Sequence, residues 1–103
     1  MPLTLQKRYI IALENAGYRR HVNPRGSRYY EMTYQGEGTG LYKREHRILV
    51  GSAGALRMTR DSITDSHEVS DALREAMLEA VPNDIREAKK LYPNSAAFTV
   101  KRR

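Results

Sequence analysis

The stretch that decides the fold is residues 41–60, LYKREHRILVGSAGALRMTR. It contains the apolar run Ile48, Leu49 and Val50, a turn with glycines at both ends over residues 51–54, and a return arm that ends in basic residues. Glycine adopts the positive φ that a tight reversal needs, so two such runs joined by a short glycine segment are typical of paired antiparallel strands. The sequence therefore predicts a β-hairpin over residues 41–60.

The alternation within this hairpin predicts which side chains face the core. On the return arm, Leu56 and Met58 are expected to point inward and Arg57 outward. The first arm has a polar outer half and an apolar inner half, so neither of its faces is uniformly apolar. A break or bulge near Arg47 would reconcile the two halves.

A second hairpin is predicted before the first, over residues 18–34. Residues 23–26, Asn-Pro-Arg-Gly, match a type I turn, because proline fixes φ at the second position and glycine permits the exit. On the arm after this turn, Tyr30, Met32 and Tyr34 share one face, which is the expected core face.

Helices are predicted on both sides of these hairpins. Thr4 is the expected cap of a first helix that ends at Gly17, with an apolar stripe of Leu5, Tyr9, Leu13 and Ala16. Asp65 and Glu68 have the spacing of a capping box and predict a second, long helix. Its predicted buried stripe is Val69, Leu73, Ala76, Met77 and Ala80.

The last part of the chain predicts two short elements. Asn83 is the expected cap of a short helix that reaches residue 91 or 92 and stops before Pro93. The alternation of Ala96, Phe98 and Val100 is compatible with a final edge strand.

The order of these elements predicts an α+β fold. Strands joined by turns too short for parallel crossovers form an antiparallel sheet of two β-hairpins. The N-terminal helix and the later long helix are expected to cover one face of it, with the short helix and the compatible edge strand added. Residues 1–100 would form a single domain, and residues 101–103 a basic tail.

Composition excludes several classes of protein. The 103 residues contain no cysteine, so disulfides, thiolate metal sites and cysteine nucleophiles are excluded, and a cytoplasmic setting fits. Lys7 and Arg8 interrupt what would be the apolar part of a signal peptide, and no apolar run approaches membrane-spanning length. We therefore expect no membrane partner.

Charge is distributed unevenly along the chain. Residues 1–60 hold eleven Lys and Arg against four Asp and Glu, whereas residues 61–98 hold four against eight, and the whole chain carries a net charge of +6. A basic surface attracts polyanions, so nucleic acid, either DNA or RNA, is the first partner to consider. The alternative is that the charge serves only solubility.

The predicted function is a small, non-enzymatic nucleic-acid-binding domain that uses the sheet face and the hairpin turns. Arginines suit phosphates, and an exposed tyrosine suits an unstacked base. The predicted binding residues are Arg19, Arg20, Arg25, Arg28, Tyr29, Lys43, Arg47 and Arg57, with Tyr42 as a second candidate for stacking. If Glu31 and Glu45 pair with these cations, the hairpins are only scaffold. The first alternative function is a protein-binding module that docks an acidic surface or forms a homodimer.

No cofactor or metal site is expected. The glycine-rich residues 35–40 lack a P-loop ending and precede a strand, so we expect a connector. Asp61, Asp65, His67 and Glu68 offer metal-ligand chemistry, but helix capping and the helix dipole explain the same acids more simply.

Histidine supports one further alternative, a small ribonuclease. General acid and base catalysis would need His21, His46 or His67 near a carboxylate and a phosphate-binding arginine. His46, beside Glu45 and Arg44 in sequence, is the best candidate of the three.

The outline is similar to that of the double-stranded RNA-binding domain, which implies phosphate contacts from a basic N-terminal end of the last helix. Here that end carries Asp65, Glu68 and Asp71, so the phosphate-binding property does not carry over.

About a quarter of the chain, near its start, also resembles the small toxin ribonucleases of the HicA type. These begin with a helix that ends in Gly-aromatic and then present Gly-Ser-His on a strand, and this chain has LENAGY at residues 13–18 and RGSR at residues 25–28. Arg28 stands in place of the histidine that the resemblance would make catalytic, so the resemblance does not assign a catalyst here.

Overall fold

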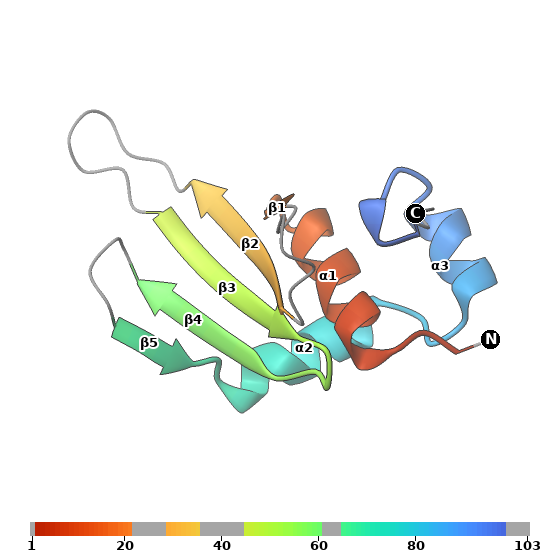
Figure 1. The fold of residues 1–103 in the computed structure, drawn as a ribbon. Coiled ribbons are helices and arrows are strands. Elements are labelled where there is room, and N and C mark those ends of the chain that lie inside the picture. The colour runs from red at the N-terminus through yellow and green to blue at the C-terminus, as the bar shows by residue number, and fades with distance from the viewer. Residues whose placement is uncertain (1, 22–28, 36–44, 61–64, 99–103) are drawn as a thin grey trace.

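An antiparallel sheet in simple chain order is the centre of the fold (Figure 1). The computed structural model describes residues 2–21, 29–35, 45–60 and 65–98. Five strands lie within these residues: β1 (Arg19–His21), β2 (Tyr29–Gln35), β3 (Glu45–Gly51), β4 (Leu56–Arg60) and β5 (Asp65–Glu68). Each pairs with the strand before it, so the predicted antiparallel sheet is confirmed.

The hairpin of β3 and β4 forms around the predicted glycine turn. The Gly51 N–H donates to the Ala55 carbonyl at 2.7 Å, and the Gly54 N–H donates to the Gly51 carbonyl at 3.0 Å. Gly54 has a φ of +80°, which glycine adopts without strain. The predicted bulge near Arg47 is wrong, because the register with both neighbouring strands is continuous through this residue. Residues 41–44 lie outside the described residues.

The first helix, α1 (Leu5–Asn15), begins and ends where the sequence predicts. The Thr4 side chain accepts a hydrogen bond from the Lys7 N–H at 3.2 Å. At the other end Gly17 has a φ of +100°, and the Tyr18 N–H donates to the Leu13 carbonyl at 2.9 Å, as in a Schellman motif. The buried residues of α1 are Tyr9, Ile10, Ile11, Ala12 and Leu13. The predicted stripe is therefore wrong at its ends, since Leu5 is 47% exposed and Ala16 is exposed.

The predicted capping box at Asp65 and Glu68 is wrong. Residues 65–68 pair with β4 as the fifth strand, because β4 would otherwise leave a row of unpaired backbone groups at its edge. The next helix, α2 (Asp71–Ala80), starts later and is capped by Ser70, which accepts from the Leu73 N–H at 3.3 Å.

The buried stripe predicted for this helix is only partly correct. Val69 is buried but precedes the helix, and Met77 is buried within it. Leu73 is 36% exposed, and Ala76 and Ala80 are exposed.

The C-terminal elements also differ from expectation. The helix α3 (Ile85–Leu91) is capped by Asp84 rather than Asn83. Where a final strand was compatible with the sequence, the 3₁₀ helix η2 (Ala96–Phe98) forms. The Ala96 N–H donates to Glu14 at 3.3 Å and its carbonyl accepts from Arg20 at 2.9 Å, so side chains use the backbone groups that a strand would present to a neighbour. Residues 99 and 100 lie outside the described part.

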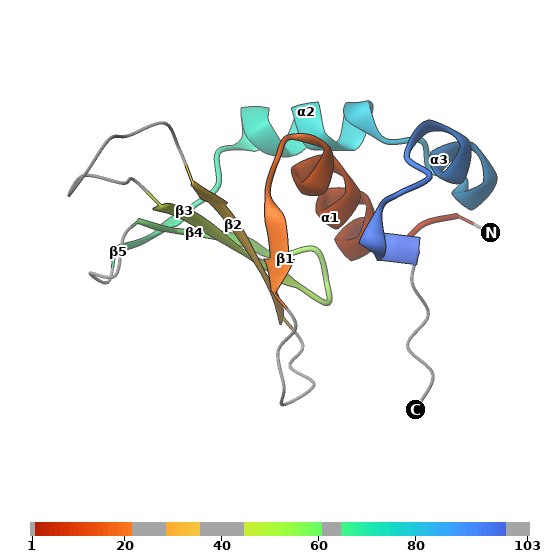
Figure 2. The same cartoon turned by 90° about the horizontal axis from the view of Figure 1, so that it is seen from above.

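Both longer helices lie on the same side of the sheet (Figure 2). Met32, Ile48, Val50 and Leu56 are at most 1% exposed on the covered face. The Arg8 guanidinium ties α1 to the end of α2 by donating to the carbonyls of Leu78 and Val81. The predicted α+β fold with one covered face is confirmed. No helix among the described residues is long and apolar enough to cross a membrane.

Candidate nucleic-acid interface

Among the described residues, no helix covers the second face of the sheet (Figure 2). Ile48 and Val50 are buried on the covered face, so their neighbours Arg47 and Leu49 lie on the opposite face. We call that side of the sheet the open face. Its residues with described side chains are Arg19, His21, Tyr29, Glu31, Thr33, Arg47, Leu49, Arg57 and Glu68.

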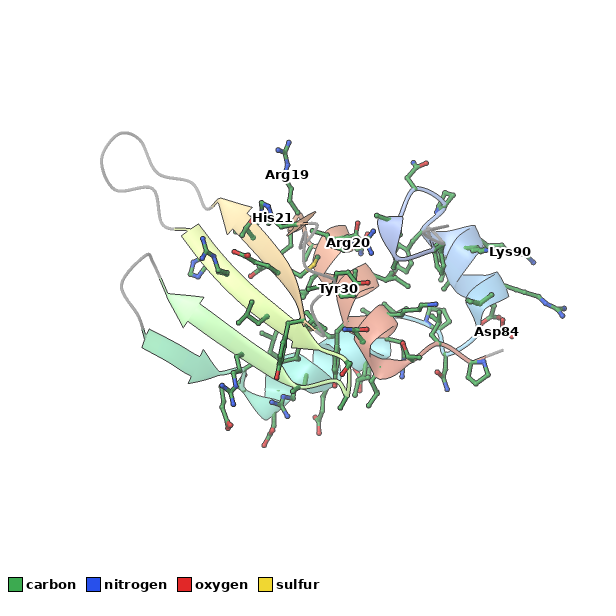
Figure 3. All side chains as sticks on the ribbon, viewed as in Figure 1. Arg19, Arg20, His21, Tyr30, Asp84 and Lys90 are labelled. Carbon is green, nitrogen blue, oxygen red and sulfur yellow. The ribbon has the colours of Figure 1, made fainter. Side chains whose placement is uncertain are left out.

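The register arranges these residues in rows across the strands. One row runs from Arg19 on β1 to Thr33 on β2 and Arg47 on β3. The next row, two residues along each strand, is His21, Glu31, Leu49, Arg57 and Glu68. Figure 3 shows Arg19 and His21 extending from one side of β1 and Arg20 from the other.

Three of the predicted binding arginines lie together on the open face. Arg19 and Arg57 are exposed, and the Arg47 side chain is 44% exposed. Arg20 lies instead on the side of the helices, where its Nη2 donates to the Ala96 carbonyl and its guanidinium lies 5.4 Å from the centre of the Tyr30 ring. The other predicted residues, Arg25, Arg28 and Lys43, and the alternative Tyr42, lie outside the described residues.

Glutamates offset part of this positive charge. Glu31 Oε1 lies 2.6 Å from Arg47 Nε, and Glu68 is the cross-strand neighbour of Arg57. Exposed ion pairs of this kind contribute about 0–1 kcal/mol to stability, so their main effect is on the local field and on side-chain orientation. The charge of the described open face is thus more balanced than the arginines alone predict.

Tyr29 provides an aromatic surface beside the arginines. It is 47% exposed, and its ring lies against Gly51 on the neighbouring strand. A Cβ atom at Gly51 would lie 3.0 Å from Tyr29 Cε1, so the absence of a side chain at residue 51 makes room for the ring. The ring is therefore held along the sheet and keeps nearly half of its surface open.

His21, which the sequence made a weaker catalytic candidate than His46, lies on the open face. Its Nε2 lies 2.5 Å from Thr33 Oγ1, and it faces Glu31 across the strand pair. His46 has the same parity as Ile48 and is half-buried on the helix-covered side. The alternation between Arg19 and His21 was the signal that places this histidine beside the arginines.

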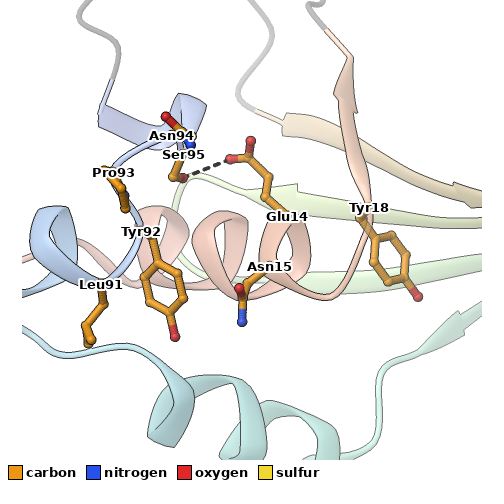
Figure 4. Close-up of a pocket in the computed structure, with 8 residues that line it drawn as sticks. All are labelled: Glu14, Asn15, Tyr18, Leu91, Tyr92, Pro93, Asn94 and Ser95. Atoms are coloured by element: carbon orange, nitrogen blue, oxygen red, sulfur yellow. Dashed lines mark hydrogen bonds between the residues drawn. The ribbon is translucent and has the colours of Figure 1, made fainter.

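A pocket of about 350 Å³ lies away from the open face, where the C-terminal end of α1 meets the segment after α3 (Figure 4). Its lining residues are Glu14, Asn15, Tyr18, Leu91, Tyr92, Pro93, Asn94 and Ser95. The Glu14 carboxylate accepts hydrogen bonds from Ser95 Oγ and the Ala96 N–H, both at 3.3 Å. Burial, together with the neighbouring Tyr34, raises the pKa of Tyr18. No lining residue is a cation, so the pocket does not extend the arginine surface.

Metal-ligating side chains do not gather in the described part of the chain. No group of three His, Asp or Glu residues there lies close enough to hold an ion. Of the acids considered from sequence, Asp61 lies outside the described residues, while Asp65 and Glu68 lie in β5, where their backbone register partners on β4 are Arg60 and Arg57.

Comparison of the chain with protein-family models, curated proteins and solved structures gives no match. The geometry and chemistry of the open face are therefore the basis for assigning a function.

Proposed function

We propose that the open face binds single-stranded nucleic acid. The observation that carries this proposal is the presence of three arginines, Arg19, Arg47 and Arg57, on one uncovered sheet face that also holds the exposed ring of Tyr29. Arginine forks match phosphate oxygens, and an aromatic ring stacks on any base whose face is free. An exposed aromatic ring suits a single strand because the bases of a duplex are already stacked on one another.

Each of these residues has a distinct role in the proposed complex. Arg19 and Arg57 would contact phosphates directly. Arg47 would do so with its guanidinium held in place by Glu31. Tyr29 would stack on one base and supply about 1–3 kcal/mol of binding free energy. Because phosphates and base faces are common to all sequences, we expect affinity with little sequence preference.

The mixed charge of the same face favours one second candidate, a protein partner. Leu49 is half-buried in the middle of the face, with Glu31 and Arg57 on either side of it in the register. An apolar centre with charges of both signs around it is also the composition of many protein–protein interfaces. A partner of that class would bind with only a modest dependence on salt.

Affinity for oligonucleotides and its dependence on salt test the nucleic-acid candidate. The test uses a fluorescent, all-deoxy, single-stranded oligonucleotide and its duplex form, each titrated at low and at moderate salt. The logarithm of affinity for a single strand falls against the logarithm of salt concentration with a slope of about 0.7 per phosphate contact. The triple variant R19Q/R47Q/R57Q should therefore bind more weakly, with a slope smaller by about 2.

A matched variant controls for net charge. Lys7, Arg86 and Lys90 are exposed on α1 and α3, away from the open face, and K7Q/R86Q/K90Q removes the same charge. It should keep most of the affinity of the wild type. Equal losses of affinity in the two triple variants would mean that binding depends only on the net charge of the protein. No affinity for either oligonucleotide at low salt would contradict the proposal. Tighter binding to the duplex would contradict the choice of a single strand.

A further inference from the structure

We infer that the open face also cleaves RNA, with His21 and Glu31 transferring the protons and Arg19 and Arg47 stabilising the phosphate. This inference rests on the proposed function, because the substrate is the bound single strand. It departs from the non-enzymatic domain that the sequence suggested, and it names His21 rather than His46 as the histidine involved.

The first support is the pairing of the acid–base groups. His21 on β1 and Glu31 on β2 are directly opposite in the antiparallel register, on the open face. Directly opposite residues have Cβ atoms about 4.5–5.5 Å apart, so both side chains reach one phosphodiester lying above them. The contact of 2.5 Å between His21 Nε2 and Thr33 Oγ1 restrains the imidazole ring.

The second support is the placement of positive charge around the same point. Thr33 is 8% exposed, and Arg19 and Arg47 are its register neighbours on the two sides. The two arginines are separated by two strand spacings, about 10 Å, so a phosphate above Thr33 would have one guanidinium on each side. The 2.6 Å contact with Arg47 also orients the Glu31 carboxylate. Charges fixed before the reaction stabilise the extra negative charge that develops on phosphorus.

The reaction that this arrangement fits is transfer of the phosphoryl group to the neighbouring ribose hydroxyl. Glu31 accepts the proton of the 2′-hydroxyl while the 2′-oxygen forms a bond to phosphorus. The bond from phosphorus to the 5′ oxygen of the next nucleotide breaks, and the His21 imidazolium donates a proton to that oxygen. The products are a 2′,3′-cyclic phosphate and a free 5′-hydroxyl. Proton exchange with water then restores both side chains, and no oxidant, reductant or cofactor enters the balance.

The substrate class follows from this chemistry. DNA has no 2′-hydroxyl, so the same face would bind single-stranded DNA without cleaving it. This difference separates the test of cleavage from the test of binding.

The experiment uses an otherwise deoxy oligonucleotide that contains one ribonucleotide, labelled at its 5′ end. We expect the full chain to cut it once, after the ribonucleotide, and to leave a cyclic phosphate on the labelled product. His21→Gln and Glu31→Gln should each lower the cleavage rate by about 10²- to 10⁴-fold, the usual contribution of general acid–base catalysis. His46→Gln is the matched control and should cleave at the wild-type rate, since this histidine lies on the other side of the sheet.

Binding of the all-deoxy oligonucleotide distinguishes the possible failures. If the wild type binds it but does not cut the ribonucleotide, RNA cleavage is overturned and the binding proposal stands. If it does not bind, both proposals fail together. Cleavage that survives unchanged in H21Q or E31Q would also overturn the inference, provided that the variant retains the wild-type circular dichroism spectrum. Should one variant misfold, the other decides the question alone.

Discussion

Arg19 and Arg20 are neighbours in β1, yet they lie in opposite environments. Arg19 is exposed on the open face, whereas Arg20 donates to the Ala96 carbonyl and lies over the Tyr30 ring on the side of the helices. The same alternation separates Leu49, half-buried on the open face, from the buried Ile48. In a strand, sequence neighbours therefore have different roles, and charge counted along the chain overstates the cations available at one surface.

The largest expected effect comes from removing an apolar side chain on each face. Ile48→Ala should lower the free energy of unfolding by about 2–5 kcal/mol, because Ile48 is 1% exposed and leaves a cavity. Leu49→Ala should cost less than about 2 kcal/mol, because part of its surface is already in water. Urea unfolding of both variants measures the difference, and equal costs would contradict the assignment of the two faces.

Substitutions of the adjacent Tyr29 and Tyr30 test the same difference between the two faces of the sheet through their effects on oligonucleotide binding. Tyr29→Ala should weaken binding of a single-stranded oligonucleotide by about 1–3 kcal/mol, through loss of a stacked base. Tyr29→Phe keeps the ring and should bind like the wild type. Tyr30→Ala should instead lower stability with little change in affinity, since Tyr30 packs against the core. Fluorescence anisotropy gives the affinities, and a loss in Y30A as large as that in Y29A would mean that the open face is not the binding surface.

Substitution of Arg20 is expected to change mainly stability, and substitution of Arg19 mainly binding, with smaller effects than those of the tyrosines. Arg20→Gln should lower the free energy of unfolding by about 1–2 kcal/mol, through the hydrogen bond to Ala96 and the contact with Tyr30, and should leave affinity unchanged. Arg19→Gln should leave stability within about 0.5 kcal/mol and reduce the salt slope of binding by about 0.7. Reversed results for the two variants would refute their placement.

The smallest effect concerns Tyr18, near the pocket at the end of α1. Burial and then Tyr34, whose ring centre lies 5.3 Å away, raise the pKa of Tyr18 above 10.0. The folded state then keeps the proton to higher pH than the unfolded state does, so the free energy of unfolding falls as the pH rises through and above 10. Unfolding of the wild type and Tyr18→Phe at about pH 9 and about pH 11 isolates this effect. The wild type should lose more stability over that interval, and identical losses would exclude a raised pKa.

Much of the fold was predictable because local chemistry determines it. Thr4 and Gly17 define the limits of α1, and the glycine turn at residues 51–54 fixes the register of β3 with β4. Alternation also placed Leu56 and Arg57 on opposite faces correctly. In each case the residue type itself favours the backbone conformation or the face that the structure shows.

The remaining differences depend on partners that are distant in sequence. The residue types at positions 65–68 favour a helix cap, but these residues instead pair with the edge of β4 as a strand. The 3₁₀ helix at Ala96 depends on Glu14 and Arg20, which are about 80 residues earlier in the chain. No local pattern contains such information.

The sequence predicted that arginines would lie on the open face, but it did not predict which side chains would face one another there. Alternation placed Arg57 on the outward face, whereas the positions of Arg19, Arg20 and Arg47 required the register of the strands with one another. The pairing of His21 with Glu31 needed the same register, because the intervening turn does not reveal which residues face each other.

The most direct test of the central claim, that the open face binds single-stranded nucleic acid, is an NMR titration of labelled methyl and aromatic groups. An all-deoxy, single-stranded oligonucleotide is added to the wild-type protein at low salt. The predicted result is that the Leu49 methyl and Tyr29 ring signals shift as the oligonucleotide binds, while the signals of Ile48, Val50 and Leu56 on the covered face keep their positions. Shifts confined to the covered face or to α2 and α3, with Leu49 and Tyr29 unchanged, would contradict it.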